Sequence, residues 1–295
     1  MWYYRDSDGV IKPYDVPTVA EITNKILRDN LAVFQIRIGK HEYEIDIVHK
    51  TQHNILTRTE RQIFQETDLE KMRVWEVNYD EILPPQPGME YSMIELNENS
   101  TEFQNISEYF YMHMPKIVHT SSLVSSSFRI SNRIIRIRKI FNPKLRDQWT
   151  FLLKKIREDN NNNDPTFKLT KLLWHGSGDL SPSIIYSDVH YGWKINYSSA
   201  KNLWGQGLYF GEDASYCHKY AFRNQNGNRE LFLAEVITGD DIISLEDMNI
   251  KEPSLKEDGK TRYDSVCGVR HETSWIWVVY ASGRAYPSYL VEYED

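Results

Sequence analysis

Apolar residues in the first seventy positions recur at the spacings of one helix and two strands. Residues 18–21 (TVAE) have the spacing of a capping box, and apolar positions follow every three or four residues, which predicts a helix over residues 18–28. Residues 31–38 (LAVFQIRI) are rich in apolar side chains, and apolar and acidic residues alternate over residues 43–47. This alternation is typical of a half-buried strand, and Gly39 between the two runs predicts a hairpin turn.

The middle of the chain contains a break and then a long helix. Pro and Gly cluster at residues 84–88, and acidic residues become frequent, which favours a boundary near 70–75 between domains at 1–72 and 75–295. Asn142 followed by Pro predicts the start of an amphipathic helix, which an Asn-rich polar run then ends. The predicted apolar stripe of this helix consists of Leu145, Trp149, Leu152, Leu153 and Ile156.

From residue 170 onward the chain reads as short strands separated by turns. The runs are KLLWHGS (171–177), QGLYFG (206–211), RELFLAEVI (229–237), WIWVVY (275–280) and YLVEY (289–293). The last two flank turn-forming residues at 281–287, which predicts a C-terminal hairpin inside a mixed or antiparallel sheet. The predicted fold class is therefore α+β, with a small α+β domain followed by a larger, sheet-rich one.

Composition narrows the class of protein. The chain has 295 residues, of which 40% are hydrophobic, and its 35 basic and 42 acidic residues give a net charge of −7. These values predict a soluble globular protein without a membrane span or a general attraction to nucleic acid. The N-terminus lacks the pattern of a signal peptide, and we expect a nuclear or cytoplasmic location. Cys217 and Cys267 are too few for a disulfide scaffold and lack metal-ligand spacing.

One basic cluster interrupts this acidic chain. Its members are Arg129, Arg133, Arg136, Arg138 and Lys139. Isoleucines alternate with these residues, so we interpret the cluster as the polar face of a partly buried element rather than as a nucleic-acid site.

The most suggestive chemistry lies at the end of an apolar strand. His175, Gly176 and Ser177 stand there, and a second glycine-rich turn precedes Tyr209. Glycines at a strand end let a ligand approach the backbone, and His, Ser and Tyr can orient the polar groups of a nucleotide. Taken alone, a His beside a Gly is more often structural, and a Tyr in a chain with 19 Tyr residues is more often a packing residue.

The segments that follow in order change this interpretation. They are EDASYCHKY (212–220), LFLAEVITGD (231–240), YDSV (263–266) and WVVYASGRAYPSYLVEY (277–293). Together with the His-Gly-Ser segment they resemble the catalytic domain of the poly(ADP-ribose) polymerase family, the diphtheria-toxin-like ADP-ribosyltransferases. The resemblance runs from about Trp75 to the C-terminus.

This resemblance implies a role for each matching residue. His175 would hydrogen-bond the 2′-hydroxyl of the adenine ribose of NAD, and Ser177 would lie beside that ribose. Gly176 would bond the nicotinamide amide through its backbone. Tyr209 and Tyr220 would stack on the two faces of the nicotinamide ring.

Two positions depart from the family pattern. Cys217 stands where the family commonly has a Ser that donates to the nicotinamide amide, and a thiol is a weaker donor. Ile276 stands where polymerising members have a catalytic Glu. A carboxylate there would accept a hydrogen bond from the nicotinamide ribose and activate an incoming hydroxyl, which an alkyl group cannot do. We therefore expect transfer of a single ADP-ribose rather than a polymer.

The N-terminal unit resembles a WWE domain. The matching positions are Trp2 to Tyr4, Asp8-Gly9, Pro13-Tyr14, Glu21, Tyr43 to Asp46, Gln52, Asn54 and Arg61 to Ile63. Ile11 stands in place of the second signature tryptophan. The resemblance implies an ADP-ribose site formed by Tyr4, Tyr43, Gln52 and Arg61, in which Arg would pair with phosphate and Tyr would stack on adenine. A partner-docking domain without such a site is the alternative.

Taken together, the two resemblances predict a protein mono-ADP-ribosyltransferase of the pentosyltransferase class. It would use NAD as co-substrate, need no metal, and act on acceptor proteins. ADP-ribosylated proteins would be further partners through the WWE-like unit. Two alternatives remain: a catalytically inactive ADP-ribose reader, and an adaptor whose transferase domain is a scaffold.

Overall fold

We describe the protein from a computed structural model, which covers residues 2–6, 11–27, 31–65, 77, 79, 82, 84–112, 114, 117–120, 128–160, 168–199, 201–270 and 274–294. The chain divides into two compact units, residues 1–75 with 108–118 and residues 76–107 with 119–295. The predicted domain boundary near 70–75 lies outside the described residues and stays a prediction. No helix in the described ranges has the length and apolar character needed to cross a membrane.

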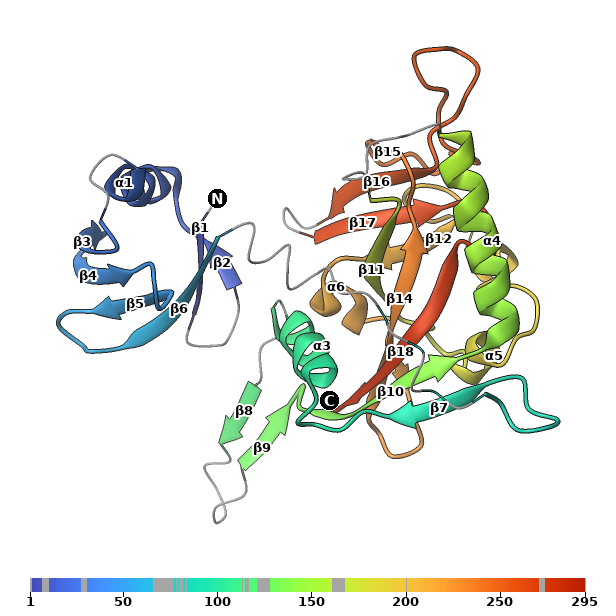
Figure 1. The fold of residues 1–295 in the computed structure, drawn as a ribbon, viewed down its shortest axis with the longest axis horizontal. Coiled ribbons are helices and arrows are strands. Elements are labelled where there is room, and N and C mark those ends of the chain that lie inside the picture. The colour runs from blue at the N-terminus through green and yellow to red at the C-terminus, as the bar shows by residue number, and fades with distance from the viewer. Residues whose placement is uncertain are drawn as a thin grey trace. The chain divides into compact units, whose positions relative to one another are not determined.

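The first unit is a curved antiparallel sheet with one helix packed on it (Figure 1). In the described residues the strand order is β2-β1-β6-β5-β4-β3. The elements are β1 (Trp2–Arg5), β2 (Ile11–Pro13), α1 (Val16–Leu27), β3 (Val33–Ile38), β4 (His41–Asp46), β5 (Thr51–Asn54) and β6 (Glu60–Gln65). Ile22 of α1 is fully buried in a core with Trp2, Phe34, Ile45 and Ile63 of the sheet.

The predicted helix and hairpin of this unit are present, with one correction. Gly39 has a φ of +60° between β3 and β4, as a tight turn requires. The helix begins at Val16 rather than at residue 18. Its N-terminal cap is the carboxylate of Asp15, which accepts a hydrogen bond from the backbone N–H of Thr18 at 2.8 Å. The predicted capping role of Thr18 is therefore wrong, because Thr18 already lies inside the first turn.

The larger unit is built on a sheet whose order in the described residues is β15-β16-β17-β12-β11-β14-β18-β10-β7, with β13 paired to β14. All neighbours are antiparallel except β15 and β16. The elements after residue 76 are β7 (Ser92–Glu95), α3 (Thr101–Tyr111), β8 (Ile117–Thr120), β9 (Phe128–Ser131), β10 (Ile134–Phe141), α4 (Pro143–Asp159), β11 (Thr170–His175), α5 (Ser183–Tyr186), the 3-10 turn η1 (Ile195–Tyr197), β12 (Leu208–Gly211), α6 (Ala214–His218), β13 (Phe222–Arg223), β14 (Arg229–Ile237), β15 (Asp241–Ile243), β16 (Ser265–Arg270), β17 (Ser274–Val279) and β18 (Ala285–Tyr293).

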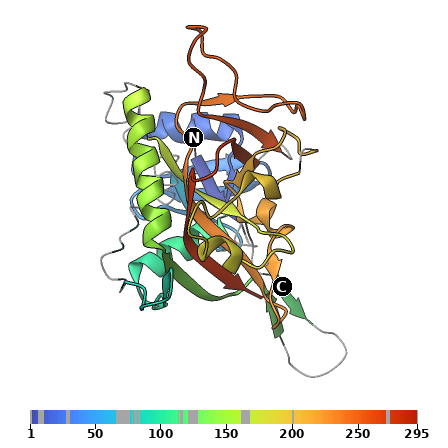
Figure 2. The ribbon, with the colours of Figure 1, turned by 90° about the vertical axis from the view of Figure 1, so that its right-hand side faces the viewer.

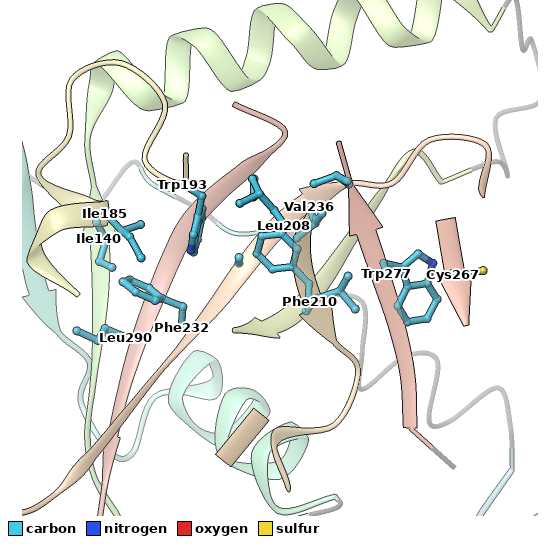
Figure 3. Close-up of a cluster of buried hydrophobic side chains, with 14 residues drawn as sticks. Ile140, Ile185, Trp193, Leu208, Phe210, Phe232, Val236, Cys267, Trp277 and Leu290 are labelled. Atoms are coloured by element: carbon cyan, nitrogen blue, oxygen red, sulfur yellow. The ribbon is translucent and has the colours of Figure 1, made fainter. Parts of the chain in front are cut away.

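Three apolar clusters of the described residues pack on this sheet, of which the third surrounds Ile276. Aromatic rings interlock in the first, where Trp193 meets Phe210 and Phe232 edge to face with centroids 5.3 Å apart in each pair (Figure 3). The second lies beneath α4, which runs alongside the sheet in both views (Figures 1 and 2). Burying aromatic surface on this scale is the main stabilising contribution to the unit.

Helix α4 confirms the amphipathic pattern. Leu145, Trp149 and Ile156 are buried, and the polar run predicted to end the helix begins at Asn160. Asn142 caps the helix: its side-chain oxygen accepts from the N–H of Leu145 at 3.2 Å. Asn142 is itself fully buried, so the cap also fastens the start of α4 to the sheet.

The predicted C-terminal hairpin is wrong. Strand β17 pairs with β12 and β16, whereas β18 pairs with β10 and β14, and three strands separate the two. Pro287, expected in a turn, lies inside β18, where the ladder with β14 is shifted between Leu233 and Glu235. A bulge of this kind tolerates a residue without a backbone N–H. Pro287 can therefore lie within a strand and does not mark a turn here.

Three members of the basic cluster, on β10, form ion pairs within the fold. Arg136 pairs with Glu292 at 2.7 Å, Arg138 pairs with Glu230, and Lys139, which is 2% exposed, pairs with Glu102 at 2.8 Å. These three cations are therefore paired within the protein and offer little free charge to a nucleic acid.

Candidate active site

A cleft of about 420 Å³ opens at the ends of β11 and β12. Its walls come from the loop after β11, the loop between α5 and β12, helix α6 and the middle of β17. The structure brings together all six residues that the sequence predicted for NAD, together with Ile276. Those six are His175, Gly176, Ser177, Tyr209, Cys217 and Tyr220.

His175 is held as a neutral ring. Its Nδ1 lies 2.8 Å from the carbonyl oxygen of Tyr209, and its ring packs against Trp193 and Phe210 with centroids 5.4 and 5.1 Å away. Burial lowers the pKa of His175 from 6.5 to about 4. Because a carbonyl oxygen only accepts, Nδ1 must carry the proton and Nε2 is left as a hydrogen-bond acceptor. Such a nitrogen suits a ligand hydroxyl.

Tyr209 offers its ring rather than its hydroxyl. The hydroxyl accepts from the N–H of Trp204 and donates to the carbonyl of Gly205, each at 2.8 Å. Burial raises the pKa of Tyr209 to about 12, so the phenol remains protonated at neutral pH. Its polar group is thus occupied inside the protein, and a ring that lines the cleft is left for stacking.

Tyr220 is a second aromatic residue of the cleft lining. It is 47% exposed, and Nζ of Lys219 lies 4.9 Å from its ring centroid. The segment is fixed by its backbone, since the carbonyl of Tyr220 accepts from the N–H of Gly178 at 2.7 Å. A side-chain carbon added to Gly176 would lie only 2.3 Å from that same carbonyl oxygen. The glycine at the strand end is therefore required by the close approach of two backbone segments.

The polar groups of Ser177 and Cys217 already bond within the protein. The hydroxyl of Ser177 donates to the carbonyl of Leu180 at 2.7 Å. The thiol of Cys217 lies 3.3 Å from the carbonyl of Trp174, to which it donates, and burial raises its pKa to about 12. Each would have to turn away from its present acceptor before it could donate to a ligand.

Ile276 is fully buried in the wall formed by β17. It faces Gly211 of β12 and Gly268 of β16 in the ladder and packs in a cluster with Trp204 and Val266. The described lining of the cleft contains no Asp or Glu but includes two lysines, Lys201 and Lys194, and Nζ of Lys194 also lies 3.4 Å from the carboxylate of Asp188. The cleft therefore favours an anionic ligand, and its described lining supplies no carboxylate that could act as a general base.

The sequence analysis missed two residues that define this cleft. Trp193 forms the wall behind His175, and Trp204 supplies the N–H that holds Tyr209. Each tryptophan is adjacent to a glycine in a segment without helix or strand periodicity. A large aromatic residue beside a glycine was the sequence feature that could have marked them as part of the cleft.

In the first unit, the predicted ADP-ribose residues gather around the buried ring of Tyr14. The ring of Tyr4 lies 5.0 Å away, the guanidinium of Arg61 lies 5.7 Å from the Tyr4 ring, and the hydroxyl of Tyr14 donates to the side-chain oxygen of Gln52. Tyr43 is close enough to contribute to raising the pKa of Tyr14. The bond from Tyr14 fixes the orientation of the Gln52 amide, and Tyr14 is a further member of the cluster that was not predicted for the site.

Among the described residues no three His, Cys, Asp or Glu side chains gather in a way that could hold a metal ion.

Comparison with known proteins identifies both units. The model of the poly(ADP-ribose) polymerase catalytic domain matches residues 100–295, and the model of the WWE domain matches residues 1–64. A probable poly(ADP-ribose) polymerase of Dictyostelium discoideum is 29% identical over 73% of this chain and 56% of its own length. The mouse protein mono-ADP-ribosyltransferase PARP10 is 28% identical over 66% of this chain and 19% of its own length.

The human protein mono-ADP-ribosyltransferase PARP12 is similar along nearly the whole chain. It is 20% identical over 99% of this chain, which spans 43% of the relative's own length. The present chain therefore covers about half or less of each of these relatives.

Proposed function

The chain belongs to the poly(ADP-ribose) polymerase family, and from that membership we propose that it transfers a single ADP-ribose from NAD to a side chain of an acceptor protein, releasing nicotinamide. This makes it a mono-ADP-ribosyltransferase of the pentosyltransferase class. The observation that carries the proposal is the fully buried alkyl group of Ile276 in a cleft whose described lining lacks any carboxylate. Two similar proteins are named as mono-ADP-ribosyltransferases, which supports the same reaction.

Different residues of the cleft bind different parts of NAD. The unprotonated Nε2 of His175 accepts a hydrogen bond from the adenine ribose 2′-hydroxyl, and the rings of Tyr209 and Tyr220 enclose the nicotinamide. The lysines of the lining offset the charge of the diphosphate. Holding the dinucleotide in this way positions the glycosidic bond and the departing nicotinamide, which lowers the barrier to bond cleavage.

The acceptor side chain must be nucleophilic without help from a carboxylate of the cleft. With an alkyl side chain at position 276, no carboxylate of the described lining can activate a ribose hydroxyl of a previously attached ADP-ribose. An acceptor carboxylate is already ionised at neutral pH and can attack without a base. Transfer to a protein side chain is thus retained while chain elongation is lost.

Product length tests this reaction directly. The full chain is incubated with labelled NAD, and the products are separated on a gel beside the variants His175→Ala and Tyr209→Ala. The exposed His190 supplies a matched control, His190→Ala. We expect one discrete labelled product in the wild type and the control, and a large loss in the two cleft variants. A ladder of long products would exclude single transfer, and equal inactivity of all four proteins would favour the non-catalytic reader or adaptor.

We further propose that the WWE domain binds ADP-ribose and so recruits ADP-ribosylated proteins. The cluster of Tyr4, Tyr43, Gln52 and Arg61 around Tyr14 offers stacking faces and one guanidinium for a phosphate. Calorimetry of the full chain with ADP-ribose tests this, since Arg61→Ala should remove one binding event. The variant Arg37→Ala, on an exposed part of β3, should keep it. If both variants bind like the wild type, the domain docks protein partners without reading ADP-ribose.

A further inference from the structure

The orientation of the Tyr209 ring is set by the turn that precedes β12. As described above, the phenol hydroxyl is bound from both sides by backbone groups of Trp204 and Gly205. Any displacement of this turn must therefore move the hydroxyl, and with it the ring face that lines the cleft. The backbone conformation of the turn is specific, because Gly205 has a φ of +71° and would place a side-chain carbon only 1.8 Å from the carbonyl oxygen of Ile250.

Trp204 is in turn held by elements outside the cleft. The hydroxyl of Tyr280, directly after β17, donates to the carbonyl of Trp204 at 2.6 Å. The indole N–H of Trp204 donates to the carbonyl of Ser244 at 3.1 Å. The indole ring lies directly over Gly268 of β16, where a side-chain carbon would come within 2.2 Å of it. Tyr280 itself does not line the cleft.

We propose that Tyr280 is a positioning residue for nicotinamide binding, acting through the Trp204 carbonyl on the ring of Tyr209. Two short hydrogen bonds, joined through the backbone of Trp204, link the Tyr280 hydroxyl to the Tyr209 hydroxyl, and a third ties the Tyr209 hydroxyl to the carbonyl of Gly205. The inference rests on the proposed function, since it takes Tyr209 to be the nicotinamide-binding ring. It predicts a defect confined to the nicotinamide half of the cleft. His175 meets Tyr209 only through the backbone carbonyl, which the β12–β17 ladder holds, and its ring packs on Trp193 and Phe210.

The variant Tyr280→Phe tests this, because it removes one hydroxyl and keeps the ring. Nicotinamide and adenosine serve as probes of the two halves of the cleft in the full chain. We expect nicotinamide to bind about three- to tenfold more weakly and adenosine to bind as in the wild type, given the usual contribution of one hydrogen bond. The matched control is Tyr286→Phe, which removes a buried hydroxyl that donates to the carbonyl of Ile140 at 3.3 Å, away from Trp204. The control should change neither affinity.

A double-variant cycle separates positioning from general loosening of the fold. In the background of Tyr209→Phe the hydroxyl at the end of the path is absent, so Tyr280→Phe should then have little further effect on nicotinamide binding. Strictly additive effects, an unchanged nicotinamide affinity in Tyr280→Phe, or an equal loss for adenosine would each overturn the inference while leaving the proposed function intact. Failure of the wild-type chain to bind nicotinamide at all would remove both.

Discussion

Replacing His175 with glutamine should make the protein less sensitive to mild acid. Burial against aromatic rings lowers the pKa of His175 from 6.5 to about 4, so the folded protein keeps this ring neutral over a range in which the unfolded chain protonates it. Between these two values the unfolded state binds more protons than the folded state. Stability is therefore complete above 6.5 and is lost as the pH falls toward about 4.

The size of the effect follows from the two pKa values. At about pH 5 the unfolded histidine is almost fully protonated and the folded one is not, which corresponds to about 2 kcal/mol of lost unfolding free energy. The limiting value, reached below both pKa values, is about 3 kcal/mol. Glutamine does not titrate, so His175→Gln lacks this contribution, and the difference in unfolding free energy between the variant and the wild type changes with pH.

Urea unfolding of the full chain at about pH 7.5 and at about pH 5 measures how much unfolding free energy each protein loses between the two pH values. The wild type should lose about 2 kcal/mol more than His175→Gln between the two conditions. His190→Gln, a change at an exposed histidine, controls for the mere loss of an imidazole and should behave like the wild type. If the wild type and His175→Gln lose stability in parallel, the buried ring is not held neutral, and the assignment of Nε2 as an acceptor fails with it.

Three further outcomes are expected. Gly176→Ala should abolish NAD binding, because the added Cβ would lie 2.3 Å from a carbonyl oxygen. The control Gly178→Ala places its Cβ in open space and should lower the unfolding free energy by only about 1 kcal/mol. Equal NAD affinities of the two variants by calorimetry would contradict this. Asn142→Ala should lower the unfolding free energy, measured by urea unfolding, by about 2–4 kcal/mol, because it removes the helix cap and two hydrogen bonds to carbonyl groups. A loss below about 1 kcal/mol would show that the Asn142 side chain contributes less than these bonds imply. Cys217 and Cys267 are buried, and burial raises the pKa of each thiol to about 12. Mass spectrometry should therefore show that iodoacetamide labels neither thiol in the folded protein and both after denaturation. Rapid labelling of the native chain would refute their burial.

Local features of this protein are encoded locally. The cap at Asn142, the apolar stripe of α4 and the turn at Gly39 depend on residues a few positions apart, and periodicity revealed them. The glycine beside His175 was also visible, because backbone segments that approach closely exclude any side chain. Thr18 shows the limit of such signals: the sequence pattern pointed to Thr18, whereas the side chain that caps the helix is Asp15, three residues earlier.

The sequence by itself determined α1, α4, the hairpin at Gly39, the strands β11, β12, β14, β17 and β18, and seven residues of the cleft lining. Only the tertiary structure decided which strands pair, because alternation marks a strand without naming its partner, and β17 and β18 are three strands apart. It alone made His175 neutral, through burial beside Trp193, and turned the hydroxyl of Tyr209 inward. Protonation state and side-chain orientation depend on neighbours brought together from distant parts of the chain, which no local pattern records.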